Sequence, residues 1–159
     1  NILFYDTQNY MKTMVDLKTI LIVEDNPQDV ELTLEALSTH NLANNVIAVG
    51  DGVEAIDYLT YKGKFESRTK GNPSVILLDI KMPRMDGIEV LEYIRADEKL
   101  KMIPVVMLTS SREEPDLVKC YKLGVNAYVV KPVGFKDFLE AVKQIGIFWA
   151  ILNEHPEVI

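Results

Sequence analysis

Short apolar runs recur along the chain from residue 20 onward, with room for a helix between each run and the next. Such runs, rich in Val, Ile and Leu, are typical of strands that are buried on both faces of a sheet. They predict five strands, at residues 20–23, 46–49, 75–78, 103–108 and 127–130. Because strands joined by helical crossovers form parallel sheets, we expect helices to cover both faces of this one.

Between the strands, apolar residues three or four positions apart predict helices. The first helix is expected to begin after Asn26, whose side chain can cap it, with Pro27 at the first helical position. Asp51 and Glu54 have the spacing of a capping box for the second helix, which should run through Leu59. Residues 61–73 then carry Gly and Pro and are predicted to form a long loop.

The start of the fourth helix has two possible signals. Ser111 and Glu114 fit a capping box, whereas Pro115 is equally suited to the first turn of a helix that begins later. The last helix is expected to begin near residue 134 and to continue to about residue 153. The apolar positions that share a helix face are Val30, Leu34 and Leu37 in the first helix, Gly87, Leu91 and Ile94 in the third, and Leu117, Cys120 and Gly124 in the fourth.

Five strands alternating with five helices fit one compact α/β domain in a chain of 159 residues. The flavodoxin-like doubly wound parallel sheet, with strand order 2-1-3-4-5, is the leading arrangement at this size. Residues 1–17 are expected to be an irregular tail, in which either Met11 or Met14 could be the natural start. Residues 18–153 should form the folded domain, and residues 154–159 a short C-terminal tail.

Composition narrows the classes of partner. The formal net charge of −7 argues against a nucleic-acid surface, which requires clustered positive charge. No apolar run approaches the roughly 20 residues that span a bilayer, and the N-terminus lacks the order of a signal peptide, so we expect a cytoplasmic protein without a membrane partner. Cys120 is the only cysteine, which excludes an internal disulfide and favours a buried apolar role.

Polar residues follow four of the predicted strands. Glu24-Asp25, Asp79, Thr109 and Lys131 all stand at carboxyl ends, which share one edge of a parallel sheet, where ligands bind. Three carboxylates at one edge repel one another, and a divalent cation with oxygen ligands, Mg²⁺ or alternatively Mn²⁺, would neutralise them. Lys131 supplies a compact positive charge for phosphoryl oxygens. Since a carboxylate can act as a nucleophile, an aspartyl phosphate is the chemistry that this set favours.

Together these motifs resemble the receiver domains of two-component response regulators, over about residues 18 to 145. The long loop and the ending at residues 148–154 resemble, more narrowly, the single-domain regulators that partner bacterial phytochromes. The motifs that carry the resemblance are Ile22-Val23-Glu24-Asp25-Asn26, Leu78-Asp79-Ile80-Lys81-Met82-Pro83 through Asp86-Gly87, Leu108-Thr109-Ser110, and Ala127-Tyr128-Val129-Val130-Lys131-Pro132.

The resemblance implies a metal site and a phosphate acceptor. Asp79 would take a phosphoryl group from the phosphohistidine of a sensor histidine kinase, and the narrower resemblance implies a kinase of the phytochrome type. Asp25 would bind Mg²⁺ directly and Glu24 through water. Asp79 and the backbone carbonyl of Lys81 would complete the protein ligands.

The resemblance also implies a switch. Thr109 and Lys131 would contact the phosphoryl group, and Tyr128 would move when Thr109 is drawn inward, with simple core packing of Tyr128 as the alternative. The Lys131–Pro132 peptide would be cis, since an X-Pro bond adopts that form cheaply. Hydrolysis of the phosphate should be slow, because the positions that tune it, Lys81 and Ser111, carry neither an amide nor an acid.

Other function classes fit these residues less well. An aspartyl-phosphate phosphohydrolase of the haloacid dehalogenase type needs a second Asp where Lys81 stands. A nucleotide- or flavin-binding domain needs a glycine-rich loop after the first strand, where this chain has Glu24-Asp25-Asn26-Pro27. A pseudo-receiver would usually lack Asp79 or Lys131. We therefore expect a phosphorylation switch rather than a turnover enzyme, with a phosphorelay intermediate as an open alternative and with output through another protein.

The last helix is predicted to make an intermolecular contact. Residues 147–152 are apolar on every side of the helix, and a helix apolar all round needs burial all round. A homodimer is the first choice, and the rival is residues 2–5 of the N-terminal tail folding back over the helix. The stripe expected to face the sheet consists of Phe138, Ala141, Val142, Ile145, Trp149 and Leu152.

Overall fold

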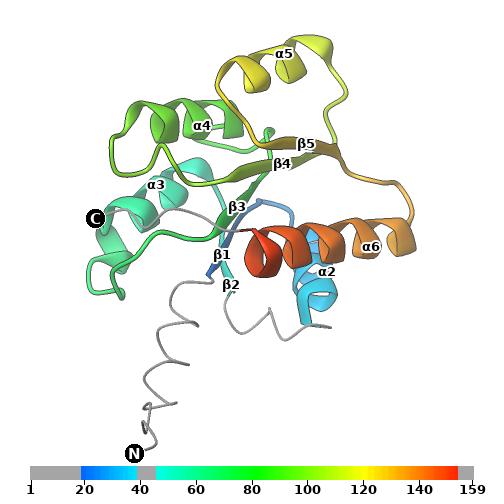
Figure 1. The fold of residues 1–159 in the computed structure, drawn as a ribbon, viewed down its shortest axis with the longest axis horizontal. Coiled ribbons are helices and arrows are strands. Elements are labelled where there is room, and N and C mark those ends of the chain that lie inside the picture. The colour runs from blue at the N-terminus through cyan, green and yellow to red at the C-terminus, as the bar shows by residue number, and fades with distance from the viewer. Residues whose placement is uncertain (1–18, 39–45, 154–159) are drawn as a thin grey trace, which may run out of the picture.

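The computed structural model describes residues 19–38 and 46–153. Its core is a single five-stranded parallel sheet with the order β2-β1-β3-β4-β5, and helices cover both faces (Figure 1). The flavodoxin-like doubly wound arrangement predicted from the sequence is therefore confirmed. The strands are β1 (Ile20–Val23), β2 (Val46–Val49), β3 (Val75–Leu78), β4 (Val105–Thr109) and β5 (Ala127–Val130).

Five α-helices alternate with these strands in the part of the chain that the structure describes. Two short segments add to them, a 3₁₀ turn in the long loop and a π-helical continuation of the last helix. The α-helices are α2 (Pro27–Ser38), α3 (Gly52–Thr60), α4 (Gly87–Ala96), α5 (Glu114–Lys122) and α6 (Phe135–Gly146), and the short segments are η2 (Gly63–Phe65) and η3 (Ile147–Leu152). No helix among the described residues is both long and apolar enough to cross a membrane.

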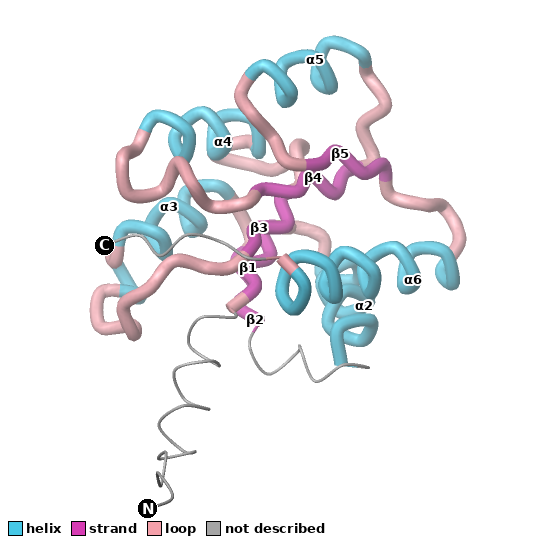
Figure 2. Tube along the Cα trace, in the orientation of Figure 1, coloured by secondary structure: helices cyan, strands magenta, loops and turns pink. Residues whose placement is uncertain are grey.

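The sheet separates two apolar layers. Helices α2 and α6 lie on one face, and α3, α4 and α5 lie on the other (Figure 2). Because successive strand residues point to opposite faces, Ile20 and Ile22 pack toward α2 and α6, while Leu21 and Val23 pack toward the other three helices. Cys120 of α5 is fully buried in that second layer, as predicted.

Four strands have the predicted bounds, and β4 begins two residues later than expected. Pro104 lacks an N–H and cannot donate to a sheet ladder, so the strand starts after it. Its carbonyl still accepts a hydrogen bond from Ile76 N at 2.9 Å, which guides the chain into β4 beside β3. Ile103 is buried but belongs to the preceding turn.

The predicted caps of the first two helices are present. Asn26 Oδ1 accepts hydrogen bonds from the backbone N–H groups of Gln28 and Asp29, at 2.9 and 3.3 Å. Asp51 Oδ1 accepts one from Glu54 N at 2.9 Å. The reciprocal half of that capping box is missing, because the Glu54 carboxylate accepts from Gly50 N instead.

At the start of α5, the alternative based on Pro115 is correct and the Ser111–Glu114 capping box is wrong. The N-cap of α5 is Glu113, which makes no side-chain cap, and Pro115 lies in the first turn. Ser111 Oγ instead donates a hydrogen bond to Asp116 Oδ2 at 2.7 Å. The hydroxyl group that was expected to cap the helix therefore ties the preceding loop to the helix.

The last helix extends as far as predicted, in two parts. After α6 ends at Gly146, residues 147–152 continue as a π-helix, with Asn153 N donating to Phe148 O at 2.7 Å. Of the predicted stripe, Phe138 and Val142 are buried and Trp149 packs on the same apolar layer. The side chains of residues 150–152 and the two predicted tails, residues 1–17 and 154–159, lie outside the described part of the chain.

Candidate functional site

Three carboxylates converge at the carboxyl edge of the sheet. Glu24 and Asp79 follow β1 and β3 directly, and the register that pairs Val23 with Leu78 places them side by side. Carboxylate oxygens of Glu24, Asp25 and Asp79 lie within 4.8 Å of one another. Glu24 and Asp79 are buried and Asp25 is exposed, so the cluster lies at the surface end of the sheet with one side open to solvent.

The backbone holds Asp79 in place. Asp79 N donates to Val23 O at 3.0 Å, and Asp79 Oδ1 accepts from the N–H of Ile80 at 2.8 Å. Gly87, the first residue of α4, passes so close that a Cβ there would lie 2.0 Å from the Asp79 carbonyl oxygen. Only glycine fits this approach, which fixes the position of α4 against the end of β3.

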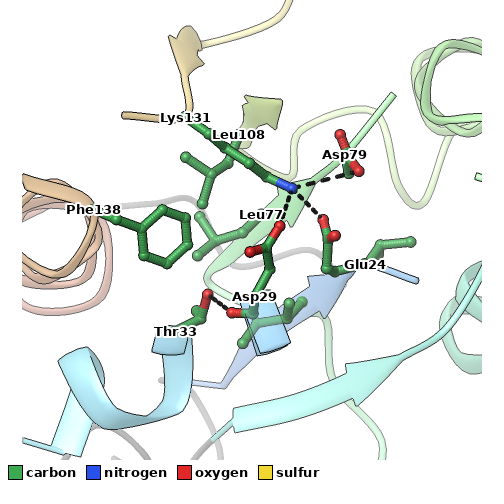
Figure 3. A pocket seen from close by; sticks show the side chains of 10 residues that line it. Glu24, Asp29, Thr33, Leu77, Asp79, Leu108, Lys131 and Phe138 are labelled. Atoms are coloured by element: carbon green, nitrogen blue, oxygen red, sulfur yellow. Dashed lines mark hydrogen bonds and ion pairs between the residues drawn. The ribbon is translucent and has the colours of Figure 1, made fainter. Parts of the chain in front are cut away.

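A partly buried lysine completes the site from the other side (Figure 3). Lys131 follows β5, and its backbone N–H donates to Thr109 O at 2.7 Å. Its Nζ lies 2.9 Å from Glu24 Oε2, 2.8 Å from Asp29 Oδ2 and 3.5 Å from Asp79 Oδ2. Burial alone would lower the pKa of Lys131, but hydrogen bonds to Asp29 and Glu24 outweigh it and raise the pKa. The ammonium group is therefore charged at neutral pH.

The carboxyl group of Glu24 is unusual. Burial raises its pKa to about 7, and the neighbouring Asp79 carboxylate adds to the rise, while the hydrogen bond from Lys131 opposes it. A buried acid next to a second acid is costly to ionise without further positive charge. The environment of Glu24 thus favours a site that takes up an additional cation.

Thr109 and Tyr128 are connected through one intermediate residue. Thr109 is fully buried, and its Oγ accepts a hydrogen bond from Ser111 N at 3.2 Å. The Ser111 carbonyl accepts one from Tyr128 OH at 3.0 Å. Tyr128 also packs against the apolar layer of α3, α4 and α5, as the alternative of core packing expects. Its movement as a switch stays a prediction.

Lys81 lies at the mouth of the site. It lines an open pocket of about 410 Å³ together with Asp25, Asp86 and Asp116. The side chain of Lys81 is exposed, while its neighbour Ile80 is buried. The role expected for its backbone carbonyl remains a prediction.

The expected cis peptide between Lys131 and Pro132 is wrong. The described residues contain no cis peptide bond, so this bond is trans. The trans form is favoured by about 0.5–1 kcal/mol for an X-Pro bond, and in this form Lys131 already reaches its carboxylate partners.

Asp29 is a site residue that sequence reasoning missed. It lies in the first turn of α2 and makes the shortest contact with the Lys131 ammonium group. A helix that follows a strand begins at the carboxyl edge of the sheet, so polar residues in its first turn can lie at the same edge as those at the strand ends. That positional rule is the only signal by which the sequence could have indicated Asp29.

The donor set fits a divalent metal ion. It offers only carboxylate oxygens, which suit Mg²⁺ or Mn²⁺ rather than zinc. The open side at Asp25 leaves space for water ligands, which Mg²⁺ usually retains.

Comparisons with known proteins agree with this geometry. Residues 20–143 match the family described as the response regulator receiver domain. Response regulator Rcp1 of Synechocystis sp. is 40% identical over 132 residues, which are 83% of this chain and 88% of that protein.

Two solved structures extend the likeness to the fold. The Mn(2+)-bound form of response regulator Rcp1 has a TM-score of 0.81 and 39% identity, covering 87% of this chain and 99% of that chain. Bacteriophytochrome response regulator RtBRR has a TM-score of 0.70 and 59% identity, covering 88% of this chain and 84% of that chain. With the sheet order and the edge cluster, these matches show that the chain belongs to the response regulator receiver domain family.

Proposed function

We propose that this chain is a single-domain response regulator that accepts a phosphoryl group on Asp79 from a sensor histidine kinase. The observation that carries the proposal is the position of Asp79. Its carboxylate is buried, belongs to a three-carboxylate cluster suited to a divalent ion, and faces the Lys131 ammonium at 3.5 Å.

In the reaction, an Asp79 carboxylate oxygen attacks the phosphorus of the kinase phosphohistidine. The new O–P bond forms as the P–N bond breaks, and the histidine keeps the bonding electrons. Glu24, Asp25 and Asp79 would hold Mg²⁺ or Mn²⁺, with the Lys81 carbonyl as a further ligand, and the bound ion supplies charge neutralisation. The Rcp1 structure with Mn²⁺ supports this choice of metal.

Lys131 and Thr109 act on the phosphoryl group. The partly buried Lys131 ammonium is a charged donor beside Asp79, where it can neutralise a phosphoryl oxygen. Thr109 donates its hydroxyl hydrogen to a second phosphoryl oxygen. Because Ser111 links Thr109 to Tyr128, drawing Thr109 toward the phosphoryl group would disturb the contact of Tyr128 with the loop before α5.

Partners follow from the family and from the surface of the last helix. The likeness to a bacteriophytochrome response regulator supports a kinase of the phytochrome type. Output would pass through a homodimer formed at the end of the last helix, where Phe148 is 51% exposed and lies against Trp149.

Loss of the phosphoryl group should be slow. The positions that would orient an attacking water carry Lys81 and Ser111, and the Ser111 hydroxyl is already engaged by Asp116. A phosphorylated state that decays within seconds at neutral pH would contradict this part of the proposal.

Mass spectrometry tests the acceptor. Incubation with acetyl phosphate and Mg²⁺ should add one phosphoryl group to the protein. The Asp79→Asn variant should gain none, whereas Asp137→Asn, which alters an exposed carboxylate on α6, should be modified like the original protein. Equal modification of Asp79→Asn would overturn the assignment.

A further inference from the structure

The Lys131 ammonium group lies near three carboxylates, of which only Asp79 is the proposed phosphate acceptor. It has three N–H donors, and two of them are used by Glu24 and Asp29. Asp79 is the most distant of the three carboxylates, at 3.5 Å against 2.9 and 2.8 Å. In this state the lysine is therefore held more tightly by its other partners than by the phosphate acceptor.

Asp29 differs from the other two carboxylates because it lies outside the metal-capable cluster, which consists of Glu24, Asp25 and Asp79. It approaches Lys131 from α2, across the site from Asp79 (Figure 3). When a cation takes Glu24 and Asp79, Asp29 stays available to the lysine.

The position of Asp29 is fixed by its helix. Its backbone N–H donates to Asn26 Oδ1 at 3.3 Å, and its carbonyl oxygen accepts from Thr33 Oγ1 at 2.6 Å. Its side chain is 26% exposed, and Lys131 is 12% exposed. The pair is thus sheltered from solvent, and α2 sets where the ammonium group rests.

We propose that Asp29 is a positioning residue that holds Lys131 in a resting place and competes with the phosphoryl group for it. This inference rests on the proposed function of Asp79 and adds a residue that tunes it. The phosphoryl group must draw Lys131 away from Asp29, so the ion pair stabilises the unphosphorylated state and slows phosphorylation.

The same contact protects the metal site from the lysine. Without Asp29, the ammonium group would lie closer to Glu24 and Asp79, whose oxygens would bind the metal ion. Loss of Asp29 should therefore weaken metal binding and, once metal is saturating, speed phosphorylation. A loosened or misfolded site would instead lower both.

The experiment compares Asp29→Asn and Asp29→Ala with the original chain. At saturating Mg²⁺, the rate of phosphorylation by acetyl phosphate should rise about threefold, which corresponds to the small stabilisation that a partly exposed ion pair provides. The dissociation constant of Mg²⁺, measured by titration without any phosphodonor, should rise by a similar factor of about three. Glu31→Gln removes one negative charge from an exposed position on the same helix, and both quantities should stay as in the original chain.

Faster phosphorylation together with weaker Mg²⁺ binding in both Asp29 variants supports the inference. An unchanged rate, or a fall in rate together with weaker metal binding, overturns it. Failure of the original chain to gain a phosphoryl group on Asp79 would instead defeat the proposed function. The metal titration does not depend on phosphorylation and still reports whether Asp29 restrains Lys131.

Discussion

Replacing Gly87 with alanine should damage both stability and phosphorylation. The added Cβ would lie 2.0 Å from the Asp79 carbonyl oxygen, 2.8 Å from its carbonyl carbon and 3.0 Å from Ile80 Cα. A comfortable carbon–oxygen contact is roughly 3.3 Å. Since every crowded atom is backbone, no side-chain rotation can relieve the clash, and the end of β3 and the start of α4 must move apart by about 1 Å.

The magnitude follows from this displacement. Overpacking that forces backbone shifts costs about 1–3 kcal/mol, and the upper end applies because the Gly87 N–H also donates to Ile80 O at 2.9 Å. A loss of about 3 kcal/mol should lower the melting temperature by roughly 6–12 °C in a domain of this size. Misplacing a reacting group by about 1 Å can cost ~10²-fold in rate, so phosphorylation of Asp79 should slow by one to two orders of magnitude.

Thermal unfolding followed by circular dichroism, together with acetyl phosphate kinetics at saturating Mg²⁺, measures both effects. Gly50→Ala is the matched control, because a Cβ there meets only the Glu54 carboxylate, at 3.7 Å. That variant should melt and react like the original chain. If Gly87→Ala also kept the original melting temperature and rate, the close approach of α4 to Asp79 would not constrain the site, and the reasoning would be refuted.

Three further predictions concern the metal, the thiol and the last helix. Asp25→Ala should weaken Mg²⁺ binding more than Glu24→Ala in titrations, because Asp25 is expected to bind the ion directly; equal affinity of Asp25→Ala and the original chain would sink that assignment. Burial raises the pKa of Cys120 from 9.0 to about 11, so its thiol should stay protonated at pH 8 and react with a thiol reagent only after unfolding; rapid reaction of the native protein would contradict this. Phe148→Glu should convert a homodimer to a monomer in light scattering, since it places a charge on the exposed apolar end of the helix; a dimer of undiminished strength would locate the contact elsewhere.

The parts of the fold that the sequence predicted well are those governed by burial. In β1 and β3 every residue is buried, so the strands read as unbroken apolar runs whose ends are sharp. Glu24 and Asp79 were identifiable for the same reason, because each is the first polar residue after such a run. The topology then brought the two together without any further information, since adjacent parallel strands share an edge.

The failures have a different origin. Ser111 and Glu114 have the right spacing for a capping box, but the spacing does not determine the path of the loop. The Ser111 hydroxyl group donates to the Asp116 carboxylate instead. The contact between Asp29 and Lys131 spans 102 residues of sequence. This contact depends on how α2 packs against the sheet relative to the end of β5, and local sequence patterns do not determine that packing.

Long-range placement also bears on how this edge would hold and release a phosphoryl group under the proposed function. The backbone of Asp79 is closely held, because its N–H donates to Val23 O and Gly87 packs against its carbonyl oxygen. Lys131, in contrast, is a long side chain with three possible carboxylate partners on separate elements. If Asp79 is the phosphate acceptor, a closely held acceptor beside a cation that can exchange partners would allow charge to be redistributed without moving the nucleophile. The part of the site expected to respond to phosphorylation is then the β5 side, where Tyr128 lies in the strand and Lys131 follows its end. Tyr128 also contacts the loop that leads into α5.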